Sequence, residues 1–313
     1  MISWRYHIVS IVAVILAFGL GILAGSSVVN DRFIRDLERN YDEAIRERDD
    51  ANDLVAVHER FAEGVQPVLR DDVLLGERAI VVTTEGMERP ARRAVDELSA
   101  AGVEVLATLS LSTRLAQPGR SENHSTIEEA LGISGTDAGF LRDRIADDLA
   151  VRLAVGPDPE GGDDVLGRLL DAGLVTADRD VEPDELLRLG GDAQLVVLAA
   201  GGVPPDGTPG PHALLVPFTE RLVRLDAAAA VVGTTDDRYG FVTAIRERSD
   251  VPDCAVVTVD DIDLAIGGIA LTMGLDRFLE DPVVDVRPGG DYGVDGDAMI
   301  VPGADEVPGS CRI

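Results

Sequence analysis

The sequence contains no lysine. All 28 of its basic residues are arginine, and they stand against 57 acidic residues, for a formal net charge of −29. A chain this acidic repels other polyanions, which excludes nucleic acid and anionic membrane surfaces as favoured partners. The absence of lysine also excludes a phosphate-binding loop of the kind that needs one. Because the acids are spread along the chain instead of clustered at ligand spacings, a solubilising, salt-adapted surface explains them better than a cation site.

Cysteine and histidine are almost as scarce. Cys254 and Cys311 lie far apart without a zinc-type cluster, so a single disulfide and two free thiols both fit the sequence. His124 and His212 are the only histidines in the C-terminal two thirds of the chain, and a Ser/His/Asp or Cys/His enzyme would depend on them. We therefore expect a protein that is not an enzyme, while paired carboxylates of the glycosidase type stay open as a further possibility.

One long run without charged side chains is present, from Ile8 to Asn30. As a helix it would be about 35 Å long, enough to cross a hydrocarbon core of about 30 Å, so we predict a transmembrane anchor over residues 1–30. A cleaved signal peptide is the alternative, with the cleavage site near residues 23–27. The residues expected at the membrane interface are Trp4, Arg5 and Tyr6. Small residues at a spacing of four, which favour close helix packing, are Ala17, Gly21 and Gly25.

Residues 31–66 have the pattern of a coiled coil. Apolar or small residues recur at alternating spacings of three and four, a pattern typical of a supercoiled seam. The seam positions are Ile34, Leu37, Tyr41, Ala44, Arg48, Ala51, Val55, His58, Ala62 and Val65. Arg48 and His58 weaken this seam, so a parallel homodimer and a single helix folded back on the body both fit. Gly64 and Pro67 are expected to end the helix.

The body, residues 70–281, alternates buried-strand runs with amphipathic segments. Near-continuous apolar strands are typical of a parallel sheet covered on both faces. The expected strands are Arg78–Thr84, Val103–Leu109, Gln194–Ala199, Ala229–Val232 and Ala255–Val259. We therefore predict a three-layer α/β domain with a mostly parallel sheet of about five strands. A mostly helical insertion is expected over about 110–190, and a flexible arm rich in glycine, proline and acids over 282–313.

Ligands of such folds bind beyond the carboxyl ends of the strands. No G-x-G-x-x-G fingerprint follows the first strand, so a nucleotide site is disfavoured. The residues that the sequence places at this possible ligand edge are Thr83, Thr84, Gly201, Gly202, Thr234, Asp236 and Asp260.

Several segments together resemble a known family. They are residues 1–10 (MISWRYHIVS), 19–25 (GLGILAG), 258–263 (TVDDID) and 291–294 (DYGV). With the order of anchor, stalk and α/β body, they resemble the mycobacterial copper transport protein B family of actinobacteria. The resemblance implies a cell-envelope protein of copper transport or copper homeostasis, held in the cell membrane with its body on the extracytoplasmic side. Arg32, Arg35, Arg39, Arg46 and Arg48 would by the positive-inside rule favour a cytoplasmic body instead.

The copper role is implied by the resemblance alone. Cu(I) prefers thiolate and thioether ligands and Cu(II) accepts imidazole, yet the four methionines are scattered and no Cys/His pair occurs. His124, His212 and Cys254 are the only candidate copper ligands that the body offers. A single helix encloses no pore, so partner proteins would supply any path. The alternatives are an envelope scaffold that acts in wall assembly or cell separation through its coiled coil, and a hydrolase of cell-wall sugars.

Overall fold

The structure is a computed structural model of the chain. It describes residues 4–158, 164–178, 181–191, 194–200, 212–236, 240–248, 251–252, 255–279, 289–293 and 298–299. By its internal contacts the chain divides into two compact units, Met1–Arg60 and Phe61–Ile313. Each unit is described by itself below.

A single helix, α1 (Trp4–Arg70), makes up the described part of the first unit and continues into the second. It passes through both Gly64 and Pro67, so the prediction that these residues end the helix is wrong. A proline inside a helix removes a hydrogen bond and costs about 3 kcal/mol. Packing offsets that cost, because Ala62 and Val65 lie against Ala265 and Ile269 within the second unit.

The predicted transmembrane anchor is corrected by the structure. Among the helices as far as they are described, none is both long enough and apolar enough to cross a membrane. The prediction that residues 1–30 form a transmembrane anchor, which rested on the run without charged side chains from Ile8 to Asn30, is therefore wrong.

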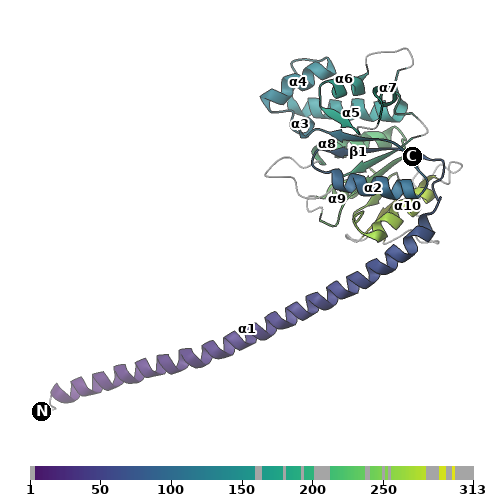
Figure 1. Cartoon of the computed structure of the whole chain (residues 1–313). Helices are drawn as coiled ribbons and strands as arrows, with labels where there is room; N and C mark the ends of the chain where they lie inside the picture. The colour runs from purple at the N-terminus through teal and green to yellow at the C-terminus, as the bar shows by residue number, and fades with distance from the viewer. Residues whose placement is uncertain are drawn as a thin grey trace. The chain divides into compact units, whose positions relative to one another are not determined.

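The second unit is built on one sheet of seven strands, in the order β3-β2-β1-β4-β5-β6-β7 (Figure 1). The strands are β1 (Arg78–Thr84), β2 (Glu104–Leu111), β3 (Val175–Ala177), β4 (Gln194–Ala199), β5 (Ala229–Val232), β6 (Val257–Val259) and β7 (Gly290–Tyr292). All neighbours are parallel except β2 and β3, which are antiparallel. Strand order reverses between β1 and β4, the kind of position where ligands bind in open α/β sheets.

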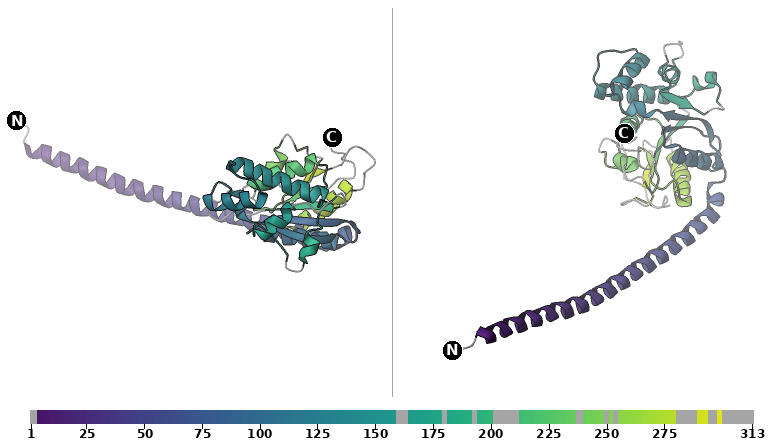
Figure 2. Two further views of the ribbon diagram at one scale, coloured as in Figure 1. Left: turned by 90° about the horizontal axis from the view of Figure 1, so that it is seen from above. Right: turned by 60° about the vertical axis from the view of Figure 1, so that its left-hand side comes forward.

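Helices cover both faces of this sheet, as Figures 1 and 2 show. On one face lie α2 (Glu88–Ala100) and α10 (Ala265–Leu279), and on the other α8 (His212–Arg224) and α9 (Phe241–Arg246) with part of the insertion. Each face of the sheet has its own hydrophobic core, because side chains alternate along β1. Ile80 and Val82 point into one core, and Ala79 and Val81 point into the other. The α/β class follows from this two-sided burial.

The segment between β2 and β4 is mostly helical. It contains α3 (Thr113–Ala116), α4 (Ser121–Leu131), α5 (Ala138–Val155), α6 (Val165–Asp171), β3 and α7 (Pro183–Leu186). These helices group together in Figure 1. Side-chain caps start three of them, for example Asp137, whose carboxylate accepts hydrogen bonds from the backbone N–H groups of Gly139 and Phe140.

The prediction of a mostly parallel sheet of about five strands is wrong, because the sheet has seven strands and is mixed. The five expected strands are all present, but β3 and β7 are added at the two edges and β3 makes the sheet mixed. Each added strand is three residues long, too short for a periodic signal. β7 also lies in the glycine-rich segment 282–313, where Gly290 faces close contacts from the Tyr292 ring that a side chain would not tolerate.

Candidate functional site

The structure divides the predicted ligand edge into two places. Thr83 and Thr84 are buried at the carboxyl end of β1, whereas Thr234, Asp236 and Asp260 follow β5 and β6. Gly201 and Gly202 lie outside the described residues. Thr83 lines a cavity that we call the hydroxyl groove, and Asp260 belongs to a group of side chains around Arg246 that we call the carboxylate cluster. Thr234 Oγ1 donates a hydrogen bond to Asp236 Oδ1 at 2.5 Å.

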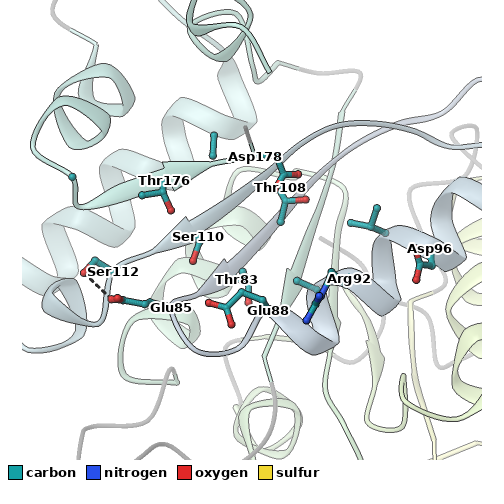
Figure 3. A pocket seen from close by; sticks show the side chains of 14 residues that line it. Thr83, Glu85, Glu88, Arg92, Asp96, Thr108, Ser110, Ser112, Thr176 and Asp178 are labelled. Atoms are coloured by element: carbon teal, nitrogen blue, oxygen red, sulfur yellow. Dashed lines mark hydrogen bonds between the residues drawn. The ribbon is translucent and has the colours of Figure 1, made fainter. Parts of the chain in front are cut away.

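The hydroxyl groove is a cavity of about 680 Å³ beside α2, over strands β1 to β3 (Figure 3). It is lined by Thr83, Glu85, Glu88, Arg92, Asp96, Thr108, Ser110, Ser112, Thr176 and Asp178, with Ala91, Val95, Gly173 and Ala177. Thr83 pairs with Ser110 across β1 and β2, and Ser110 pairs with Thr176 across β2 and β3. One row of hydroxyls thus crosses three neighbouring strands, on the part of the α2 face that the helix leaves uncovered.

The walls of the groove carry the charge. Glu88, Arg92 and Asp96 recur every four residues on α2, so they share one side of that helix. At the end of the groove, Glu85 Oε2 accepts hydrogen bonds from Ser112 Oγ at 3.2 Å and from the Thr113 N–H at 3.3 Å. These contacts orient Glu85 and occupy only one of its two oxygens. With Asp178 the lining holds four carboxylates and one guanidinium.

The carboxylate cluster is organised by Arg246 of α9. Its guanidinium donates to Asp260 Oδ2 at 2.6 Å, to Thr258 Oγ1 at 2.8 Å and to the backbone carbonyl of Tyr292 at 2.7 Å. Asp291 Oδ1 lies 3.6 Å from Arg246 Nε. One arginine therefore joins β6 to β7 and neutralises buried Asp260, which makes this a structural ion pair.

The next residue, Asp261, is also buried, but unlike Asp260 its carboxylate receives no hydrogen bond from an arginine in the described part of the chain. Its side chain is 1% exposed, and neither carboxylate oxygen has a hydrogen-bond partner among the described residues. Burial raises the pKa of Asp261 to about 7, and the nearby charges of Asp260 and Asp263 add to the rise. The start of α10 lies against it, because a Cβ on Gly267 would come within 2.1 Å of the Asp261 carbonyl oxygen.

Of the three candidate copper ligands, the structure describes the side chain of His124. His124 lies on α4, where Nδ1 is 3.0 Å from the Pro118 carbonyl and Nε2 is 3.5 Å from Glu128 Oε1. The Thr136 backbone N–H lowers the pKa of Glu128. The side chain of His212 and the whole of Cys254 lie outside the described residues, as does Cys311. In the part of the chain that is described, no three His, Cys, Asp or Glu side chains are close enough to hold a metal ion.

The remaining predicted site residues lie in α1. Trp4 and Tyr6 are 77% and 76% exposed, and Ala17 and Gly21 are exposed as well. Arg5 and Gly25 belong to the helix, but their side chains lie outside the described residues.

Sequence reasoning missed most of the groove. Thr83 was expected at an edge, but Thr108, Ser110 and Thr176 were not, because β3 was not predicted and the row exists only once β3 pairs with β2. A signal was present in β2, where Thr108 and Ser110 alternate with buried Leu109 and Leu111. Such alternation indicates that one face of the strand lacks a helix over it.

Known proteins match this chain over nearly its full length. A family model described as "Copper transport outer membrane protein, MctB" matches residues 1–302. Proteins named "Copper transporter MctB" from Mycobacterium bovis and from two strains of Mycobacterium tuberculosis are each 25% identical over 323 aligned positions. The alignments cover 96% of this chain and 99% of each relative.

Proposed function

This chain belongs to the MctB family, and from that membership we propose that it takes part in copper transport or copper homeostasis at the cell envelope, without catalysis. The observation that carries the proposal is the match of the family model to residues 1–302. Because the relatives align over 96% of the chain, the proposal concerns the whole protein and not one module.

The proposal includes association with a membrane, with the α/β unit on its extracytoplasmic side. The family description names an outer membrane protein. Exposed apolar side chains along the start of α1 support membrane association, and they include Trp4, Ile11, Ile15, Phe18 and Leu20. Apolar surface of this extent is unusual on a protein that contacts only water.

In this proposal copper is transported, and the side chains of the described residues bind it only weakly. His124 and Glu128 offer one imidazole and one carboxylate four residues apart on a helix, a set that suits Cu(II) better than Cu(I). A tight site would need more ligands than this pair. We therefore propose that the protein supports copper movement together with partners.

The test of the function is copper handling in cells. An actinobacterial strain that lacks its own relative would be complemented with the full-length chain, with the His124→Asn variant, or with empty vector. We expect the chain to restore the copper content of the cells and their tolerance to added copper. Equal copper contents with and without the chain would overturn the proposal. Titration of the full-length protein with Cu(II) and Cu(I) separates direct binding, tighter than about 1 μM, from action through partners.

A scaffold that assembles through α1 is the second candidate. Of the predicted seam, Leu37, Tyr41 and Val55 are 59%, 66% and 59% exposed, so this face is available to a second copy. Ala62 is buried against α10 of the same chain and is not available. We propose a parallel homodimer through the exposed part of the seam. Cysteine substitution at Tyr41 should give a disulfide-linked dimer on oxidation, whereas cysteine at Glu43 should not.

A further inference from the structure

We propose that the hydroxyl groove binds an uncharged saccharide, a ligand that copper transport does not require. The groove was defined above by its lining residues, its volume of about 680 Å³ and the row of hydroxyls across three strands. Sites for small molecules in proteins typically measure about 300–1,000 Å³. The volume is therefore in the range for a ligand of a few sugar rings.

The floor of the groove offers hydroxyls that are not already used. Thr83 Oγ1 donates to the Met87 carbonyl at 2.9 Å and is satisfied. Thr108, Ser110 and Thr176 have no hydrogen-bond partner for their hydroxyls among the described residues. Each of these hydroxyls can donate one hydrogen bond and accept others. A ligand that covers them must do both, and the hydroxyls of a sugar do.

The walls of the groove suit the same chemistry. The second oxygen of Glu85 has no partner among the described residues and is held in place by the bonds that Oε2 accepts from Ser112 and Thr113. Carboxylates accept from sugar hydroxyls, and Arg92 can donate to a sugar oxygen. Hydrogen bonds to charged groups are stronger than those between neutral groups, so these two residues would contribute most of the affinity.

Other classes of ligand fit less well. An anion would face four carboxylates and only one guanidinium, so repulsion disfavours it. An apolar ligand would bury the floor hydroxyls without partners, at a cost in free energy for each. A polyamine would satisfy the carboxylates, but it has no acceptor for Arg92. A bare metal ion would find no group of three carboxylate, imidazole or thiolate ligands among the described residues.

The test is saturation-transfer difference NMR on the full-length protein. The probes are neutral di- and trisaccharides of glucose, galactose, mannose and N-acetylglucosamine, with spermidine as the cationic probe and glucose 6-phosphate as the anionic one. We expect at least one neutral saccharide to bind with a Kd below about 1 mM. Absence of binding by every saccharide would overturn the proposal, and so would tighter binding of spermidine or of glucose 6-phosphate.

Variants locate the binding in the groove. Thr108→Val and Thr176→Val remove a hydroxyl and keep the shape, and each should weaken binding about three- to tenfold. Glu85→Gln should weaken it about tenfold or more, because a charged acceptor is lost. Thr126→Val on α4 is the matched control, since its hydroxyl donates to the Glu122 carbonyl outside the groove. Equal affinities of Thr176→Val, Glu85→Gln and the wild type, with folding unchanged, would place any binding elsewhere and overturn the assignment.

Discussion

Glu97 of α2 accepts a hydrogen bond from Arg70, the last residue of α1, with Arg70 Nη1 and Glu97 Oε2 2.5 Å apart. The Glu97 side chain is 1% exposed, and Gln66 and Arg93 also contact it at 2.7 and 3.2 Å. Four polar side chains from α1 and α2 thus form a network in which Glu97 and Gln66 are buried and the two arginines are partly exposed. A Cβ on Gly268 would fall 2.6 Å from Glu97 Cδ, so the network also requires the close approach of α10.

We expect Glu97→Ala to destabilise the second unit strongly. The substitution removes the charged acceptor of Arg70 and of buried Gln66, and a hydrogen bond to a charged group contributes about 1.5–3 kcal/mol. The measurement is pulse proteolysis across a urea series, which gives the free energy of unfolding. Asp96→Ala is the control, because Asp96 is exposed on the same helix and should change stability by less than about 0.5 kcal/mol. Equal effects of the two substitutions would show that the network contributes nothing.

Two helical glycines should respond to alanine with opposite signs. A Cβ at Gly267 would lie 2.1 Å from the backbone oxygen of Asp261, which cannot rotate away. We expect Gly267→Ala to cost about 3 kcal/mol or more. Gly64 of α1 has nothing within 4 Å of its Cβ position, so Gly64→Ala should stabilise the helix by about 0.5–1 kcal/mol. Thermal unfolding of both variants checks the pair, and a shift of the same sign in both would contradict the assigned packing.

The central strands were predictable because each is buried on both sides. The ranges Arg78–Thr84, Gln194–Ala199 and Ala229–Val232 agree with the structure residue for residue. The prediction failed at the edges, where β3 and β7 are specified by pairing with a neighbour and not by their own sequence. The transmembrane prediction rested on the absence of charge from Ile8 to Asn30, and among the described residues no helix meets both the length and the hydropathy that a membrane span needs.

The candidate site was only partly predictable. Thr83 and Asp260 follow from the rule that ligands bind at the carboxyl ends of parallel strands. The rest of the groove depends on an antiparallel edge strand that brings Thr176 beside Ser110 across about 65 residues of intervening sequence, and no local pattern contains that information. Arg246 was missed as well, because a single arginine on a short helix has no motif that marks its partners.

Arg246 should hold β7 in the sheet. We expect Arg246→Met to remove three hydrogen bonds and the ion pair with buried Asp260, which destabilises the β6–β7 edge by about 3 kcal/mol or more. Hydrogen exchange followed by mass spectrometry should show faster exchange in the peptide that contains Gly290 and Tyr292. The control is Arg144→Met, which removes the same charge from a surface pair with Asp148. Unchanged protection at β7 in Arg246→Met would contradict this role.

Asp261 should make the stability of the second unit depend on pH. Its pKa rises from 3.8 in the unfolded chain to about 7 in the fold, so the folded state binds the proton more tightly. The stabilising contribution of the protonated group is complete below about pH 4, falls by about 1.4 kcal/mol per pH unit above that, and is lost once the pH passes about 7. Over the difference of about 3 pKa units, the loss amounts to about 4 kcal/mol.

Asp261→Asn tests this dependence directly, because the amide keeps the shape and cannot ionise. We expect the variant to match the wild type near pH 4 and to be more stable by up to about 4 kcal/mol near pH 8, where the wild type carries a buried charge. Urea unfolding at pH 4, 5, 6, 7 and 8 gives the difference between the two proteins at each pH. Asp171→Asn, at an exposed position on α6, is the control and should give a difference near zero throughout. A constant difference between Asp261→Asn and the wild type would mean that Asp261 does not titrate in this range. The effect would then come from packing alone.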